Sequence, residues 1–172
     1  MANASIFRDF ITALRERWRS ELPEVRPVAD AFGPAMPKAS TFYAGFSRQL
    51  GMHLFLAFQH SSKSWEVGSF TVNVVLSKRE GAPKSDGGPF PPYDGAALTE
   101  GSYRIGHLLG RDDKWWLLTA DSGPVGRVQW RAKSYCNRDA VLRTAADDVT
   151  RDVRAALAKL GVVTAEVAAG KT

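Results

Sequence analysis

The residues that most often carry enzyme chemistry are few in this chain. Its three histidines, His53, His60 and His107, and its single cysteine, Cys136, are the only imidazole and thiol ligands for a transition metal. Metal sites need three or four convergent ligands, and the spacing of these residues matches no short metal motif. If one strand holds His53 and His60, their opposite parity aims them at different faces. We therefore expect no metal and no other cofactor.

Nucleophilic and acid–base catalysis find little support either. No residue next to Cys136 would activate it, and no Gly-x-Ser-x-Gly turn presents a serine. The paired carboxylates Asp112-Asp113 and Asp147-Asp148 are adjacent in sequence, and adjacent side chains do not face each other as an acid and a base would. We interpret the first pair as a turn and the second as helix surface. The pattern leans against an enzyme; the alternative is a hydrolase whose residues converge only in the fold, with His53 or His107 beside a carboxylate.

Aromatic side chains form the best candidate for a binding site. Tyr43, His53, Trp65 and Trp116 would line a groove that stacks on bases or holds a peptide. The competing interpretation places these rings in the core, because aromatic side chains mostly bury apolar area.

Residues 78–101 are rich in proline and glycine, show no periodicity and predict a long surface loop. Long loops often carry binding residues, so Phe90 and Tyr93 are candidates for contact with a partner. The alternative is that both rings pack on the edge of the sheet and anchor the loop. Gly87-Gly88 is not a phosphate loop, because it lacks the Lys-Ser/Thr that this chemistry requires.

The element that must position these residues is a meander of three antiparallel strands within 41–77. Apolar residues alternate with the others in the two-residue period of a strand. They are Phe42, Ala44 and Phe46, then Leu54, Leu56 and Phe58, and then Phe70, Val72, Val74 and Leu76. The apolar face must be covered, while the other face shows His53, Gln59, Thr71 and Asn73. Gln49-Leu50-Gly51 suits a hairpin turn.

Amphipathic helices are predicted near both ends of the chain. Ser5 can cap a helix that runs to about Leu22, since apolar residues recur there at intervals of three and four. Asn137 can cap a second helix from about Arg138 to Leu160, which Gly161 is placed to end. The small side chains in its apolar stripe permit close approach to a sheet, and 161–172 is expected to fray.

A further strand pair is predicted at 103–109 and 114–119, joined by a turn at 110–113. It would enlarge the sheet to about five strands. Trp115 and Trp116 must then point to opposite faces, so one of the two rings needs cover on the second face, which the C-terminal helix would supply. Residues 125–134 are ambiguous between a strand and the start of a helix.

The chain has 172 residues, of which 44% are hydrophobic, and this length suits a single α+β domain over 1–172. No apolar run approaches the roughly 20 residues that span a bilayer. Arg8 and Asp9 interrupt the apolar core that a signal peptide needs. A single cysteine agrees with a reducing compartment. We therefore expect a cytoplasmic protein with no membrane partner.

The formal net charge is +5, from 23 Lys and Arg against 18 Asp and Glu. This balance is mild, and basic residues often sit beside acids, as in Arg15-Glu16-Arg17, so it is a weak clue to partner type. The nucleic-acid alternative is an accessory protein that uses an exposed tryptophan for stacking and basic residues for phosphates. Those basic residues are Arg104, Arg127, Arg131 and Lys133.

Five short segments occur in order within roughly 6–160. They are Ser40-Thr41-Phe42-Tyr43, Leu54-Phe55-Leu56-Ala57-Phe58-Gln59-His60-Ser61, Ser69-Phe70-Thr71-Val72-Asn73-Val74, Tyr103-Arg104-Ile105-Gly106 and Lys114-Trp115-Trp116. These segments resemble the DUF4304 family of uncharacterised bacterial proteins, and the segments 23–40 and 81–95 depart from that family. The resemblance implies an α+β domain with no established activity and hence no catalytic residues to transfer.

The predicted fold is thus an α+β domain in which an antiparallel sheet of about five strands is packed by the N-terminal and C-terminal helices. The expected function is non-enzymatic protein binding, because no catalytic set accompanies the long aromatic-bearing loop. By analogy with small cytoplasmic proteins of this build, which often serve as binding partners, this includes neutralisation of a toxin by occlusion.

Overall fold

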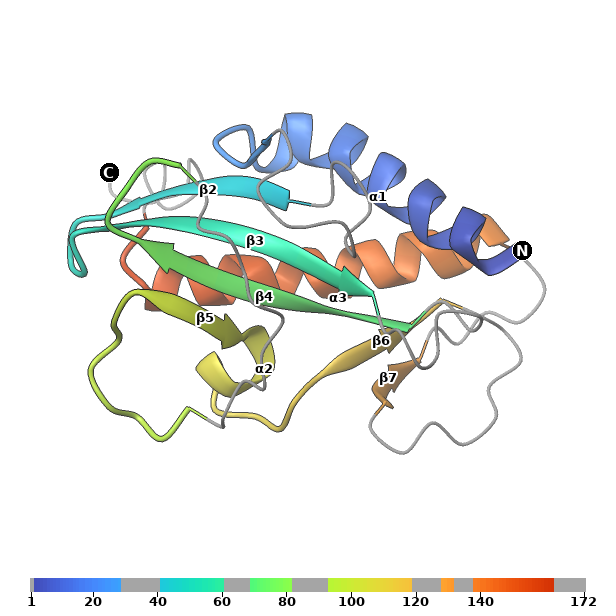
Figure 1. The fold of residues 1–172 in the computed structure, drawn as a ribbon. Helices are drawn as coiled ribbons and strands as arrows, with labels where there is room; N and C mark the ends of the chain where they lie inside the picture. The colour runs from blue at the N-terminus through green and yellow to red at the C-terminus, as the bar shows by residue number, and fades with distance from the viewer. Residues whose placement is uncertain are drawn as a thin grey trace, which may run out of the picture.

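The structure, a computed structural model, describes residues 2–28, 41–60, 69–81, 93–118, 128–131 and 138–162. The elements in chain order are α1 (Ala2–Glu21), β1 (Arg26–Pro27), β2 (Thr41–Ser47), β3 (Met52–His60), β4 (Ser69–Ser77), β5 (Gly101–Arg104), α2 (Ile105–Leu108), β6 (Trp115–Leu117), β7 (Val128–Arg131) and α3 (Arg138–Lys159). Figure 1 shows one twisted sheet with α1 and α3 together behind it. The predicted α+β class, an antiparallel sheet packed by the two terminal helices, is confirmed.

The centre of the sheet is the meander β2–β3–β4, in which both pairs are antiparallel as the alternation predicted. His53 lies opposite Phe46 on one side and Ser77 on the other. The turn between β2 and β3 ends at Gly51, whose φ of 65° is a left-handed conformation that glycine adopts freely. The described strands are ordered β1-β2-β3-β4-β6-β7, and β5 also pairs with β4.

The core lies between the meander and the two long helices. Phe10 of α1 packs on Phe70 with their ring centroids 4.8 Å apart, and Trp18 meets Phe42 edge-on at 5.0 Å. All four rings are at most 1% exposed, and burying each one stabilises the fold by about 1.5–3 kcal/mol. The indole N–H of Trp18 donates to the hydroxyl of Thr150 at 2.9 Å, which joins α1 to α3.

A β-bulge in β2 overturns one expectation from the alternation. The register of β2 against β3 shifts between Tyr43 and Gly45, and Gly45 has a φ of 123°. An extra residue reverses which face the following side chains reach. Phe46, predicted to belong to the buried face, is therefore 45% exposed, whereas Ser47 is buried and donates its hydroxyl to the carbonyl oxygen of Leu160.

The predicted hairpin of 103–109 with 114–119 is wrong. β5 stops at Arg104, and the next residues form the short helix α2, in which Leu109 N–H bonds the Ile105 carbonyl at 3.1 Å. β5 and β6 both pair with β4 instead of with each other, β5 along Asn73–Leu76 and β6 at Ser69–Phe70. The sheet therefore has two short strands where one longer hairpin was expected.

Gly106 explains why the chain forms the short helix α2 here instead of the predicted hairpin. A Cβ atom at Gly106 would lie 2.3 Å from the backbone oxygen of Asp112, so the turn folds back onto α2 more closely than any other residue would allow. The Arg111 amide donates to the Gly106 carbonyl at 2.9 Å. These local bonds replace the ladder of a hairpin.

Trp115 and Trp116 point to opposite faces of the sheet, as predicted. Trp116 is fully buried on the helix face and stacks on Phe70 with a centroid distance of 5.5 Å. Trp115 is partly buried on the second face, where the Arg104 guanidinium lies 5.2 Å from its ring centroid. The expectation that the C-terminal helix covers this second ring is wrong, because α3 packs on the same face as α1.

The helix boundaries agree closely with the sequence pattern. α1 begins at Ala2, so Ser5 lies inside the helix instead of capping it. α3 spans Arg138–Lys159, and Gly161 follows it with a φ of 71°, as a C-terminal glycine should. The proposed cap Asn137 lies outside the described residues, as does the tail beyond Val162.

The connections are described in part. Residues 78–81 and 93–100 contain no helix or strand, in agreement with the predicted loop, while 29–40, 61–68 and 82–92 lie outside the described residues. Within the ambiguous segment 125–134, Val128–Arg131 is a strand that runs parallel to β6. None of the described helices is long and apolar enough to cross a membrane.

We expect Gly45→Ala to lower the free energy of unfolding by about 2 kcal/mol, because a side chain at positive φ is strained. The new Cβ atom would also lie 3.0 Å from Cγ1 of Val162. Urea unfolding measures the loss. The matched control is Gly81→Ala, where φ is not in the left-handed region and no atom of the described residues lies within 4 Å of the added Cβ, and it should change stability by less than about 0.5 kcal/mol. Equal stability of the two variants would contradict the strained bulge.

Candidate functional site

The second face of the sheet carries polar and aromatic side chains around a small buried apolar cluster of Phe55, Ala57 and Val75. Near its middle, Arg104 donates from one terminal nitrogen to the side-chain oxygens of Gln59 and Asn73, both at 2.8 Å. Asn73 in turn donates to Gln59 at 2.9 Å, and Arg104 Nε lies 3.5 Å from a carboxylate oxygen of Asp113. The positive charge of Arg104 is therefore engaged within the domain.

Four rings gather where the β2–β3 hairpin ends on this face. The hydroxyl of Tyr43 lies 2.9 Å from Nδ1 of His53, and the Tyr43 ring meets Phe55 edge-on at 5.3 Å. Phe46 meets His53 edge-on at 4.9 Å. The bulge thus adds an exposed ring to a partly buried aromatic cluster.

Charged residues surround these rings. The Arg26 guanidinium lies over the Tyr43 ring, 5.1 Å from its centroid. Burial raises the pKa of the Tyr43 phenol, the charge of Glu80 raises it further and Arg26 opposes the rise. Glu80 and Arg26 are therefore close enough to Tyr43 for their charges to act on it.

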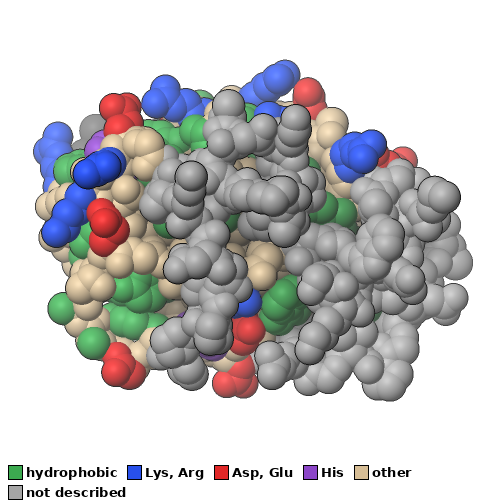
Figure 2. Space-filling model, in the orientation of Figure 1, with side chains coloured by type: hydrophobic (Ala, Val, Ile, Leu, Met, Phe, Trp, Pro, Cys, Tyr) green, Lys and Arg blue, Asp and Glu red, His purple; other side chains and the backbone are tan. Residues whose placement is uncertain are grey.

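More basic residues follow the strand ends at the same end of the sheet. Arg48 comes directly after β2, and Lys78 and Arg79 come directly after β4; all three are exposed. Figure 2 shows Lys and Arg side chains gathered at the left end, where the hairpin and the end of β4 lie in Figure 1. We call this the hairpin-end surface. It consists of Arg26, Tyr43, Phe46, Arg48, His53, Lys78, Arg79 and Glu80.

The structure brings together two of the six predicted binding residues, Tyr43 and His53. Trp116 is in the core on the opposite face, and Tyr93 packs edge-on against Tyr103 at 6.1 Å, which is the anchoring alternative for the loop. Trp65 and Phe90 lie outside the described residues.

The residues of the nucleic-acid alternative are not brought together in the described part of the chain. Arg104 is held by Gln59, Asn73 and Asp113, as described above. Arg131 ends β7, but its side chain is not among those described, and Arg127 and Lys133 lie outside the described residues. Phosphate binding by this set stays a prediction.

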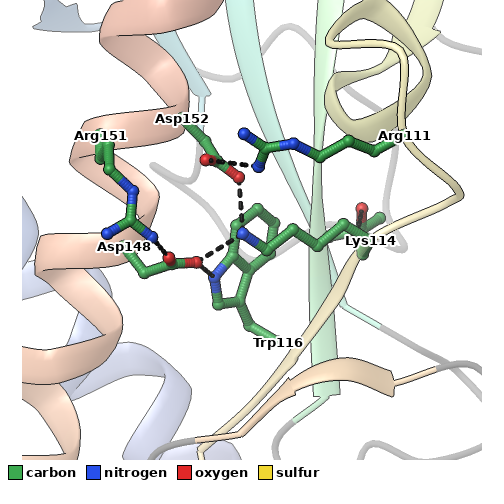
Figure 3. Close-up of polar contacts among 7 residues, drawn as sticks. Arg111, Lys114, Trp116, Asp148, Arg151 and Asp152 are labelled. Atoms are coloured by element: carbon green, nitrogen blue, oxygen red, sulfur yellow. Dashed lines mark hydrogen bonds and ion pairs between the residues drawn. The ribbon is translucent and has the colours of Figure 1, made fainter.

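A second polar cluster lies buried between the sheet and α3 (Figure 3). The ammonium group of Lys114 donates to Asp148 at 2.6 Å and to Asp152 at 2.7 Å. The indole N–H of Trp116 donates to the same oxygen of Asp148 at 2.8 Å. The Lys114, Asp148 and Asp152 side chains are 8%, 5% and 1% exposed, so the ion pairs are almost fully removed from water.

Two arginines close the cluster on its outer side. Arg151 pairs with Asp148 from the same helix, and Arg111 lies 3.2 Å from the second oxygen of Asp152. Burial lowers the pKa of the Lys114 ammonium, the hydrogen bond and charge of Asp152 oppose the change, and Arg111 and Arg151 add to it. Each charge in the cluster is thus compensated by a neighbour, which lets the buried ions hold α3 against the sheet.

The sequence pattern did not reveal this cluster. Asp147-Asp148 was interpreted as helix surface, which holds for the exposed Asp147 and is wrong for Asp148, at 4% exposure. The missed signal is spacing, because Asp148 and Asp152 are four apart and directly precede the apolar-stripe residues Val149 and Val153. Phe46 was missed although Gly45 inside a strand pattern is a known sign of a bulge.

Two reactive side chains of these clusters bond to neighbours within the domain. His53 shares its Nδ1 with the Tyr43 hydroxyl, and the Lys114 amine is enclosed by its own ion pairs. Within the described ranges, no three His, Cys, Asp or Glu side chains are grouped to hold a metal ion.

Comparison with known proteins assigns no family. No family model matches the chain, and neither a curated protein nor a solved structure shows significant similarity to it. The resemblance to the DUF4304 family therefore stays an untested prediction.

We expect Lys114→Met to lower the free energy of unfolding by about 3 kcal/mol, because it leaves two buried carboxylates short of their shared cation. Urea unfolding of the double variant Lys114→Met with Asp152→Leu should show a loss smaller than the sum of the single losses, by about 1 kcal/mol or more. Arg19→Met is the control, since its ion pair with Glu16 is exposed on both sides. Strictly additive losses would show that the buried pair is not coupled.

The lowered pKa of Lys114 also predicts a pH dependence with a definite sign. Between that lowered value and the ordinary value of 10.5, the unfolded chain keeps a proton that the native chain has released. Stability from this residue therefore rises with pH across the window. The difference in unfolding free energy between the wild type and Lys114→Met should widen as pH rises toward the ordinary lysine pKa of 10.5, because other titrating groups cancel in the comparison. A difference that stays flat or shrinks would contradict the lowered pKa.

Proposed function

We propose that this protein is a non-enzymatic protein-binding domain and that its partner docks on the hairpin-end surface. The bulge at Gly45 carries the proposal, because it turns Phe46 out of the core and leaves the ring 45% exposed beside His53. Bulges often re-aim a side chain at a functional edge of a sheet. An exposed aromatic ring next to other rings suits the anchor residue of a protein interface.

The hydrogen bonds that the reactive side chains make inside the domain support a role without catalysis. The Lys114 amine, the Arg104 guanidinium and Nδ1 of His53 all bond to neighbours inside the domain. Occluding a partner requires none of these groups to react. Neutralising a toxin by covering it is one such role, and it is the form of binding that the sequence led us to expect.

Binding to nucleic acid is the second candidate, because four cations lie on the same surface. Two observations favour a protein instead. Glu80 lies among the cations and would repel phosphates, while it could pair with a basic residue of a protein. Phe46 is also the only large apolar side chain that is exposed among the described residues, whereas single-strand binders stack several bases on several rings.

We expect Phe46→Ser to reduce capture of a specific partner from extracts of the source cell by about tenfold or more, as loss of an interface anchor does. Quantitative mass spectrometry of affinity-captured protein measures this. Arg8→Ser, on the exposed face of α1, is the matched control and should capture as the wild type does. Urea unfolding should show that both variants keep wild-type stability. Equal capture by Phe46→Ser and the wild type, or the absence of any specifically captured protein, would refute the proposal.

A further inference from the structure

The hairpin-end surface carries four exposed cations. Arg26, Arg48, Lys78 and Arg79 form no ion pair within the described part of the chain. Arginines elsewhere do so repeatedly: Arg17 pairs with Glu21 at 2.6 Å, and Arg111 pairs with Asp152. Arg8, Arg15 and Arg143 are also in no ion pair among the described residues, so this surface is distinguished by four such cations near the exposed Phe46 ring.

Two acidic residues lie near these cations and offset their positive charge only in part. The charge of Glu80 raises the pKa of the Tyr43 phenol, and Glu100 accepts a hydrogen bond from the backbone N–H of Lys78 at 2.7 Å. Four positive side chains against these two acids leave a net positive surface around the Phe46 ring. A complementary partner must therefore bring carboxylates together with an apolar group.

The strand register gives the spacing of these charges. Arg26 lies opposite Tyr43 on the outer side of β2, while Lys78 and Arg79 follow β4, two strands away from β2 on the other side. Three strand spacings from β1 to β4 amount to about 14 Å. Arg26 is level with Val75, and Lys78 lies three residues, about 10 Å, further along the strands, so the two groups are about 17 Å apart, which an extended chain covers in about five residues. Phe46 on β2 and His53 on β3 lie between the two groups of cations.

From this arrangement we infer that the hairpin-end surface binds an acidic protein segment in which an apolar residue is flanked on both sides by Asp or Glu. The apolar side chain packs on Phe46 and His53, and the flanking carboxylates pair with Arg26 on one side and with Lys78 and Arg79 on the other. This inference rests on the proposed function and specifies the chemistry of the partner.

The test uses the full chain and two short synthetic peptides. One peptide has glutamates on both sides of a central leucine, and the other has lysines in place of the glutamates. Amide NMR shifts of the labelled protein should move around Phe46, His53 and Lys78 with the acidic peptide only. Binding should weaken as salt is raised, because the cations are exposed.

Charge reversal locates the contact. Lys78→Glu combined with Arg79→Glu should weaken acidic-peptide binding by about tenfold or more, since two partner charges lose their attraction and meet repulsion. Arg8→Glu on α1 is the control and should weaken binding by less than about twofold. Urea unfolding confirms that the variants remain folded.

Four results would overturn the inference: no shifts with the acidic peptide at millimolar concentration, shifts that cluster elsewhere, tighter binding of a single-stranded DNA oligonucleotide, or binding only to vesicles that contain phosphatidylserine. The proposed function fails separately. If Phe46→Ser loses a cellular partner that the charge-reversal variant still captures, the result supports the proposed protein binding and contradicts the proposed acidic partner segment.

Discussion

Burial of one face of the β2–β3–β4 meander is the constraint on which the other features of this structure depend. Large apolar side chains from three neighbouring strands require a continuous cover, and α1 and α3 supply it together from the same side. Both helices pack on that side, and the second face holds a smaller buried apolar cluster of Phe55, Ala57 and Val75 beside a polar network and the rings near Phe46. The two faces of the sheet thus differ in the size of the apolar surface that they bury.

The position of α3 depends on more than apolar contact. Lys114 reaches across from the sheet to Asp148 and Asp152, and Trp18 and Ser47 bond to α3 and to the residue after it. Hydrogen bonds and ion pairs are directional, so they fix the rotation of α3 about its axis and its position along that axis. A stripe of small apolar side chains alone would define both less well. Removal of the buried cation would cost much more than an exposed ion pair contributes, because the remaining carboxylates cannot regain water.

The sequence predicted the parts of the fold that follow from periodicity. The meander, the two long helices and the opposite directions of Trp115 and Trp116 all follow from periods of two or 3.6 residues. The failures occur where a single residue interrupts a period: Gly45 shifts the register of β2, and Gly106 lets the chain fold back where a hairpin was expected. The proposed binding surface was predicted only in part for the same reason. Tyr43 and His53 follow from alternation, whereas Phe46 reaches them only through the bulge.

The end of α3 returns the chain to the hairpin. Val162 lies against Gly45 and Gly161 against Gln49, while the start of α1 lies at the far end of the sheet in Figure 1. The described chain therefore leaves α3 beside the bulge that exposes Phe46, and it enters α1 at the opposite end of the sheet.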